Sequence, residues 1–358
     1  MLTAYKLYLT YSAAVNPHGQ MPHVSVRGGR ASAVNAGYGP VFSEALVTAT
    51  GGSSNLIAVG LSLEPPSQCK LSAAKVEVGT GAWVSLRPPF ELDDGWRLSI
   101  GELGVAEVEQ CDLWLCSSRG PADPDEATRW YQALALHHRF RLQFARRVEV
   151  HGGSVRRYTR MKKYLSAFSP ANITGPIDDD VLRAAKLTGD QLSDHQRAGR
   201  WGGRLGRGTW SLLFGLRQEY GEFRHLDLVR ALDALLYAPN AKAFAERGKR
   251  LFDCSPMRVP DAQEVLLFVY RLRSCIEHGE SITTAMRTLA AEGCRYSEQQ
   301  LVTAAQELAA ACYIAVIAEP AAATMFAQDD LKPTWTRVLA GQPLPVHVQV
   351  DLTSALST

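Results

Sequence analysis

The sequence predicts an α+β protein in which a β-rich N-terminal domain, folded as an antiparallel β sandwich or barrel, precedes an all-α helical bundle. Two observations support this division. Up to about residue 118, short apolar runs alternate with clusters of Gly, Pro, Asn and Ser, as in strands joined by tight turns. From about residue 170 onward, apolar residues recur at helical spacing.

The expected strands of the N-terminal part are short. They lie at residues 6–11, 23–26, 56–59, 75–78 and 112–115. Glycines at 28–29, at 51–52 and at 79 and 81 are typical of the hairpin turns between such strands. None of these glycines precedes an expected helix, so they do not predict a phosphate-binding loop.

The expected helices begin after the loop at 120–124. They lie at residues 127–144, 209–220, 226–237, 241–252, 262–278, 282–291 and 298–318. Ser297 and Gln300 have the spacing of a capping box, and Gly279 and Gly293 suit the left-handed positions that end helices. The predicted organisation is a β-rich domain at 1–118, a linker helix and basic segment at 119–170, a helical domain at 171–340 and a tail at 341–358.

Composition favours a soluble protein. The 358 residues are 46% apolar and 21% charged, with a net charge of +2. The seven cysteines contain no Cys-x-x-Cys pair, which favours a reducing cytoplasm over a disulfide or zinc framework. The N-terminus has no signal-peptide pattern, and the apolar run at 308–318 is too short to span a bilayer. We expect a cytoplasmic protein with no membrane contact, no metal and no cofactor.

The first of two basic segments lies at 146–164. The 38 basic residues of the chain comprise 29 Arg and 9 Lys, and Arg suits phosphate recognition, although a GC-rich genome produces the same bias. Tyr158 and Tyr164 alternate with the cations, as in a groove that stacks bases, and a solvated linker face is the alternative. The RNA contacts expected here are Arg156, Arg157, Arg160, Lys162 and Lys163.

The second basic segment is the glycine-rich stretch at 195–208. It carries four arginines, a tryptophan and no acid. Its glycines would let the backbone approach a phosphate chain, while a flexible surface insertion is the alternative. The RNA contacts expected here are Arg197, Arg200, Arg204 and Arg207.

The end of the expected helix at 262–278 carries the strongest candidate site. Arg271 precedes His278 with six residues between them, and Arg273 with four. Chance alone produces roughly two such Arg–His pairs in a chain of this composition, so the structural context of the motif has to show whether it marks a functional site. Arg271, Ser274 and His278 share a helical stripe with Leu267, opposite the apolar face of the helix. An outward stripe of this kind predicts a partner helix.

This helix and the two before it resemble the HEPN superfamily, and within it the Apea-like branch. That superfamily is defined by an arginine, four to six arbitrary residues and a histidine on a helix of a small bundle, often with a polar residue after the arginine. Here Arg273 and His278 provide the motif and Ser274 the polar residue, while 228–236 and 244–247 are similar to the two preceding helices. The resemblance covers about residues 195–320. Asp233 departs from it, because the branch commonly has Glu there.

The resemblance implies a metal-independent endoribonuclease, often a toxin or an antiviral effector, in which two HEPN domains pair as a homodimer. His278 would transfer protons during attack of a ribose 2′-hydroxyl on the adjacent phosphate, an effect typically worth about 10²–10⁴-fold. Arg273, or alternatively Arg271, would hold the phosphate and stabilise the transition-state charge. Ser274 would orient either group, and Glu277 would pair with Arg273.

Other interpretations use the same residues. A histidine beside a C-terminal glycine can simply cap its helix, with the arginine in a surface ion pair. A HEPN module can also bind RNA or a partner protein without cutting RNA, or cover a second protein as an antitoxin-like scaffold. With the ribonuclease function, the N-terminal β domain would serve as a sensor, a regulator that meets a partner protein, or a target-recognition module.

Overall fold

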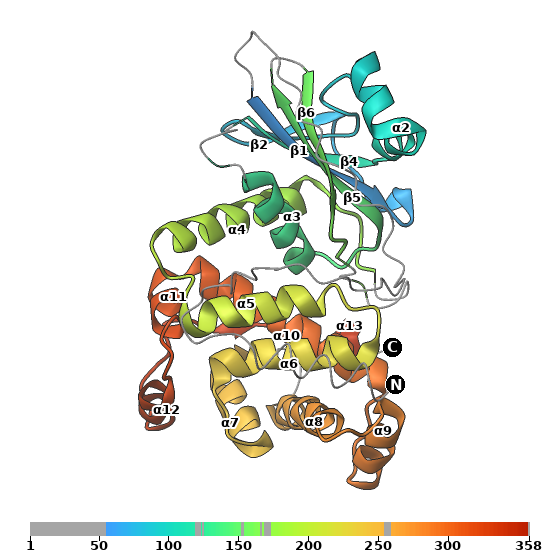
Figure 1. Ribbon diagram of the computed structural model, residues 1–358. Coiled ribbons are helices and arrows are strands. Elements are labelled where there is room, and N and C mark those ends of the chain that lie inside the picture. Colours follow the sequence, from blue (N-terminus) through green and yellow to red (C-terminus); the bar gives the residue numbers. More distant parts are fainter. Residues whose placement is uncertain are drawn as a thin grey trace, which may run out of the picture. The chain divides into compact units, whose positions relative to one another are not determined.

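The computed structural model describes residues 55–118, 123, 125–151, 154–164, 167, 173–253 and 259–356 (Figure 1). The expected strands at 6–11 and 23–26 lie outside the described residues, as do the glycine turns at 28–29 and 51–52. In the described part an antiparallel sheet occupies the N-terminal half and helices the C-terminal half. The α+β prediction is confirmed.

Six strands form one antiparallel sheet with the order β2-β3-β4-β1-β5-β6. Their bounds are β1 Asn55–Leu63, β2 Lys75–Gly79, β3 Ala82–Ser85, β4 Leu113–Ser117, β5 Leu142–His151 and β6 Ser154–Met161. The strands expected at 56–59, 75–78 and 112–115 correspond to β1, β2 and β4. Among the described residues this is a single sheet rather than the expected sandwich or barrel, because helices cover its two faces.

The alternation of side chains along the central strand β1 explains why helices cover both faces of the sheet. The elements that accompany the sheet are η1 Pro66–Gln68, α2 Asp94–Glu109, α3 Glu126–His137 and α4 Asp179–Arg197. Leu56 and Ala58 belong to a buried cluster with α2, whereas Ile57 and Val59 belong to another with α3. Successive side chains of a strand point to opposite faces, so a strand buried along its length needs cover on both. Sequence reasoning did not predict α2.

The sheet does not end at residue 118. β5 pairs with β1 along nearly its whole length and β6 pairs with β5, so the basic segment at 146–164 is mostly the hairpin that completes the sheet. The helix expected at 127–144 ends at His137, because the chain from Leu142 onward forms β5. The sheet therefore continues past the predicted boundary at residue 118. One buried cluster links the α3 face of the sheet to the C-terminal helices.

The C-terminal part is helical, as predicted. Its elements are α5 Gly203–Gly215, α6 Gly221–Leu236, α7 Ala241–Leu251, β7 Phe252–Asp253, α8 Val259–Glu277, α9 Ile282–Ala291, α10 Glu298–Ala318, α11 Pro320–Phe326, α12 Lys332–Leu339, β8 Val348–Gln349 and α13 Thr353–Leu356. The expected bounds of α9 and α10 are confirmed, and Ser297 and Gln300 form the predicted capping box. Residues 341–356 are not a free tail, because β8 pairs with β7 and Leu352 is buried.

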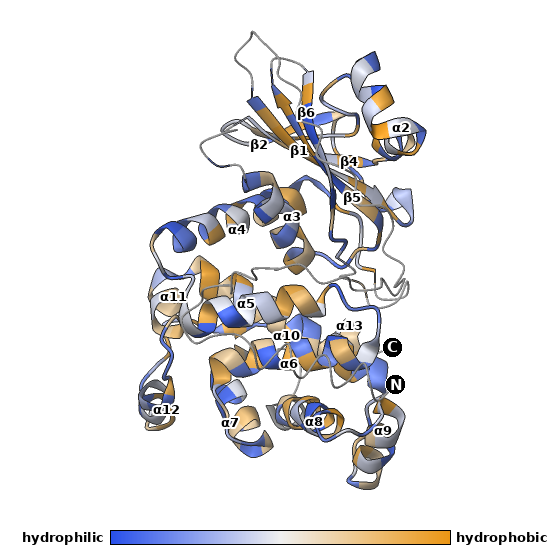
Figure 2. Cartoon of the chain, in the orientation of Figure 1, coloured by the Kyte–Doolittle hydropathy of each residue, from blue (hydrophilic) through white to orange (hydrophobic). Residues whose placement is uncertain are grey.

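Helix α10 lies in the core of the helical part, where it contacts α4, α6, α8 and α13. It is the one helix in the described ranges that is long and apolar enough to cross a membrane, yet most of it is buried in the fold. A buried apolar helix of this kind is consistent with a soluble protein. By contrast, hydrophobic and hydrophilic stretches alternate along α4, whose buried side includes Leu182 and Leu192 (Figure 2).

Candidate active site on helix α8

Arg273 joins the Arg–His helix α8 to helix α6. Its Nη1 lies 3.2 Å from Oδ2 of Asp233 on α6, and its Nε lies 3.1 Å from Oε2 of Glu277, one turn further along α8. The guanidinium also lies 5.2 Å from the ring centroid of Tyr270, and only 16% of the side chain is exposed. Burial alone would lower the pKa of Arg273, but Glu277 and Asp233 outweigh burial and the pKa is raised. Arg273 is a fixed, neutralised cation.

Further contacts between α6 and α8 extend this network. Arg230 on α6 lies 3.3 Å from Oε1 of Glu277 and 3.4 Å from Oδ1 of Asp227. Burial raises the pKa of Asp227 to about 6, although Arg230 acts in the opposite direction. Nε2 of His225 donates to the carbonyl oxygen of Val269 at 2.8 Å, and burial lowers the pKa of this histidine to about 4. These contacts hold α8 in one position against α6.

Arg271 is held more loosely than Arg273. Its Nη1 lies 2.9 Å from Oε2 of Glu292, just after the end of α9. The exposed fractions of the two side chains are 38% and 37%. A surface ion pair of this kind contributes about 0–1 kcal/mol, so a phosphate group can replace the carboxylate readily.

His278 follows the last residue of α8 at the surface. Its backbone N–H donates to the carbonyl oxygen of Ser274 at 3.1 Å, and Gly279 follows with a φ of 92°. The next two N–H groups return to carbonyls of the last turn at 3.0 and 3.1 Å, which closes the helix as a Schellman motif. The left-handed position predicted for Gly279 is therefore confirmed. Within the described residues the imidazole of His278 has no hydrogen-bond or ion-pair partner.

The two arginines of the motif thus lie in different surroundings. Arg273 and Glu277 face the carboxylate and guanidinium groups of α6. Arg271, Ser274 and His278 follow one another at intervals of three and four residues, so they project from one side of the helix. Ser274 is half-buried, and its side chain makes no hydrogen bond within the described structure.

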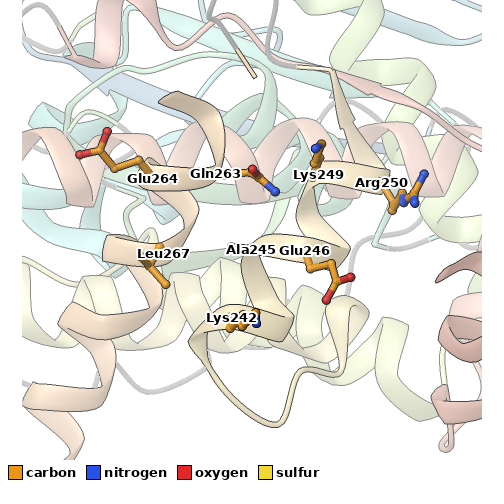
Figure 3. Close-up of a pocket in the computed structure, with 8 residues that line it drawn as sticks. All are labelled: Lys242, Ala245, Glu246, Lys249, Arg250, Gln263, Glu264 and Leu267. Carbon is orange, nitrogen blue, oxygen red and sulfur yellow. The ribbon is translucent and has the colours of Figure 1, made fainter. Parts of the chain in front are cut away.

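A pocket of about 650 Å³ lies between α7 and α8, beside the predicted stripe (Figure 3). Its lining residues are Lys242, Ala245, Glu246, Lys249, Arg250, Gln263, Glu264 and Leu267. Figure 3 shows Lys249 and Arg250 on α7 and Glu264 on α8. The cations outnumber the carboxylates, and Glu264 is already 3.2 Å from Arg295. Sequence reasoning missed this basic pocket, although the Lys249–Arg250 pair near the end of an expected helix was an available signal.

The basic hairpin β5–β6 does not gather its cations into one groove. Arg157 and Arg160 are three residues apart on β6 and therefore lie on opposite faces of the sheet. Arg157, Arg160 and Lys163 each lie within ion-pair distance of a carboxylate. Arg156 is half-buried, and Lys162 is exposed. The structure therefore does not bring these five candidates together.

Tyr158, which the sequence suggested for base stacking, belongs to a buried polar network under α2. Its Oη donates to Oε2 of Glu107 at 2.6 Å, and Nε of Arg146 donates to the same oxygen at 2.7 Å. Burial alone would raise the pKa of Glu107, but the hydrogen bonds from Arg146 and Tyr158 outweigh burial and lower it. This network fixes α2 to the sheet.

The glycine-rich segment at 195–208 is mostly helical. Helix α4 runs to Arg197 and α5 begins at residue 203, so only 198–202 connect them. Arg204 and Arg207 lie on the first turns of α5, where they bond to the backbone and the carboxylate of Asp329 at 2.6 and 2.7 Å. Arg197 and Arg200 bond to side chains at the end of α4. The expected flexible loop is therefore short.

No protein-family model matches this chain, and no curated protein or solved structure matches it. The resemblance to the HEPN superfamily therefore rests on the residues of α6, α7 and α8. Those helices are consecutive in the chain, and α8 contacts both α6 and α7. Asp233, the position at which the sequence departs from the Apea-like pattern, contacts Arg273 directly.

Proposed function

We propose that the helical part of this protein is a metal-independent endoribonuclease of the HEPN type, active in the cytoplasm as a toxin or antiviral effector. The observation that supports this proposal best is the exposed imidazole of His278, on the same side of α8 as Arg271 and Ser274. Imidazole gains and loses a proton near neutral pH, and guanidinium binds phosphate through a planar fork. Cleavage of a phosphodiester needs both properties.

In the proposed reaction a ribose 2′-oxygen attacks the adjacent phosphorus. One neutral imidazole takes the proton of the 2′-hydroxyl, the bond from phosphorus to the 5′-oxygen breaks, and a second, protonated imidazole gives its proton to the leaving oxygen. The products are a 2′,3′-cyclic phosphate and a free 5′-hydroxyl. Because each chain supplies one His278, we propose that two chains pair through α8 as a homodimer and contribute one histidine each.

We assign the phosphate contact to Arg271 rather than to Arg273. Arg271 has a single exposed ion pair, and a phosphate that replaces Glu292 gains the fork of the guanidinium with little loss of stability. Arg273 lies against Asp233 and Glu277, and removing it from them would break two ion pairs and leave Glu277 with Arg230 alone. Arg273 then acts as a positioning residue that fixes α8.

A non-catalytic module that binds RNA or a partner protein is the second candidate function. The carboxylates favour it, since both arginines of the motif lie against acids in the single chain. In this alternative, replacing His278 leaves binding nearly unchanged. For either function we propose that the β sheet and its helices act as the sensor or regulatory module.

The test is an RNA cleavage assay in EDTA with the purified full-length chain, single-stranded RNA and transfer RNA. The proposal predicts cleavage that persists in the chelator, yields 2′,3′-cyclic phosphate ends and is abolished by His278→Ala. His347→Ala is the matched control, because His347 is also exposed and lies far from α8 in the sequence.

The proposal fails if purified protein cuts none of these RNAs, if EDTA stops the cleavage, or if His278→Ala cuts as fast as His347→Ala. Intact RNA binding without cleavage in both variants would support the non-catalytic module instead. Analytical ultracentrifugation of the same samples checks the homodimer.

A further inference from the structure

Helix α5 exposes two aromatic side chains beside an arginine. Trp210 and Phe214 are 45% and 47% exposed, whereas large aromatic side chains are buried in most folds. Their ring centroids are 6.3 Å apart, and the guanidinium of Arg217 lies 5.5 Å from the ring centroid of Phe214. We call Trp210, Phe214 and Arg217 the α5 row. The opposite side of α5 is buried in the core.

The arginine of the α5 row is held in place by Tyr164, which lies three residues after the end of β6. Nη2 of Arg217 donates to Oη of Tyr164 at 2.6 Å, and its guanidinium lies 4.8 Å from the centroid of that ring. Tyr164 is itself buried, and its N–H donates to Oη of Tyr131 at 3.0 Å. In the described part of the chain Arg217 has no carboxylate within ion-pair distance. Its positive charge is therefore fixed in position and uncompensated.

The α5 row also connects the two basic segments that the sequence singled out. Arg207 precedes Trp210 by three residues, and Tyr164 ends the basic stretch at 146–164. Along α5, positions 207, 210 and 214 follow at intervals of three and four, so Arg207, which is paired with Asp329, lies on the same side of the helix as the rings. Arg217 lies two residues after the end of α5, beside the ring of Phe214. Helix α5 contains two arginines and no acid.

We propose that the α5 row is a stacking platform for the unpaired bases of a nucleic-acid strand. Proteins that bind single strands combine exposed rings, on which bases stack, with cations that follow the backbone. Trp210 and Phe214 supply the rings, and Arg217 supplies a cation with no carboxylate partner in the described part of the chain. Stacking reads only the faces of the bases, so the platform accepts RNA and DNA alike. The proposal rests on the proposed function insofar as RNA is the biological strand.

Trp210 gives a direct test, because it is the most exposed of the seven tryptophans, all of which lie in the described ranges. His278→Ala protein is titrated with oligo(U) and oligo(dT) of about 12 nucleotides in EDTA, a length that spans a typical single-strand site. Both strands should quench the tryptophan fluorescence. In a Trp210→Phe background the quenching should disappear while the affinity, measured by anisotropy of labelled strand, stays within about 3-fold, since the ring remains.

Substitution of the rings should weaken binding. Trp210→Ala and Phe214→Ala should each weaken binding of both strands by about 5-fold or more, as expected for loss of a base–aromatic stack. Leu98→Ala is the matched control, because Leu98 is an exposed apolar residue on α2 and is predicted to leave the affinity unchanged. Binding of oligo(U) but not of oligo(dT) would overturn the stacking mechanism, because such selectivity requires recognition of the ribose.

The proposal is overturned if neither strand quenches Trp210, or if both alanine variants bind as tightly as Leu98→Ala. It is also overturned if these variants change only the oligomeric state in sedimentation experiments, which would make the face an interface between copies of the chain. These outcomes are separate from the proposed function. If the strands quench Trp210 but the wild type does not cleave RNA, the stacking platform is supported and the nuclease is rejected. If both alanine variants cleave RNA as fast as the wild type, the nuclease is supported and the platform is rejected.

Discussion

Oδ2 of Asp233 lies 3.2 Å from Nη1 of Arg273, and Oδ1 of the same carboxylate accepts the N–H of Ala238 at 3.0 Å. One side chain therefore binds the backbone just after α6 and holds the arginine of α8. A carboxylate that accepts from the backbone just after one helix and pairs with a cation on another helix links the positions of the two helices. The orientation of the Arg–His helix depends on this carboxylate.

Removing Asp233 should therefore loosen α8. Asp233→Ala is expected to lower the free energy of unfolding by about 1–2 kcal/mol, the range of a partly exposed charge-assisted hydrogen bond. Urea denaturation of Asp233→Ala, Arg273→Ala and the double variant measures the coupling between the two residues. Effects that simply add would show that the pair does not interact.

The two arginines of the motif should separate in function. Arg271→Ala should abolish RNA cleavage and change the free energy of unfolding by less than about 0.5 kcal/mol, because its ion pair is exposed. Arg273→Ala should reduce both cleavage and stability. Paired cleavage assays and urea melts check this. A stable, inactive Arg273→Ala beside an active Arg271→Ala would assign the phosphate contact to Arg273 instead.

Asp227 should give the stability a specific pH dependence. Its folded pKa of about 6 lies above the ordinary value of 3.8, so the folded state binds the proton more tightly. Wild-type stability should therefore fall relative to Asp227→Asn as the pH rises from about 4 to about 6, by about 2–3 kcal/mol. Urea melts at intervals of pH measure the difference. A difference that does not change between pH 4 and pH 7 would contradict the assignment.

The carboxylate of Glu107 should be essential to the sheet. Glu107→Ala leaves the guanidinium of Arg146 buried without its partner, and we expect a loss of about 3–5 kcal/mol. Glu109→Ala, two residues along α2, removes an exposed ion pair to Arg97 and should cost less than about 0.5 kcal/mol. Thermal and urea melts compare the two variants. Similar losses would show that Glu107 is not the anchor.

The sequence by itself determined the helices whose bounds are set by signals within a few residues. The bounds of α9 and α10 follow from apolar spacing and from caps such as Ser297, because each of these signals acts within a few residues of the chain. Gly279 likewise ends α8, because glycine adopts the left-handed backbone conformation at low cost. The stripe that carries Arg271, Ser274 and His278 needs only the helical repeat.

The Arg273–Glu277 pair, one helical turn apart, was expected from the sequence, whereas tertiary structure decided which charges from distant segments meet. Arg271 and Arg273 are equivalent by spacing, and they differ because one lies near Glu292 and the other near Asp233, forty residues away in the chain. The contacts of the basic hairpin could not be predicted from the sequence for the same reason, because pairing with β1 decides on which face of the sheet each side chain lies. The α5 row is visible only after the buried side of that helix is known. Side-chain chemistry sets what a residue can do, but distant parts of the chain set its burial and its partners.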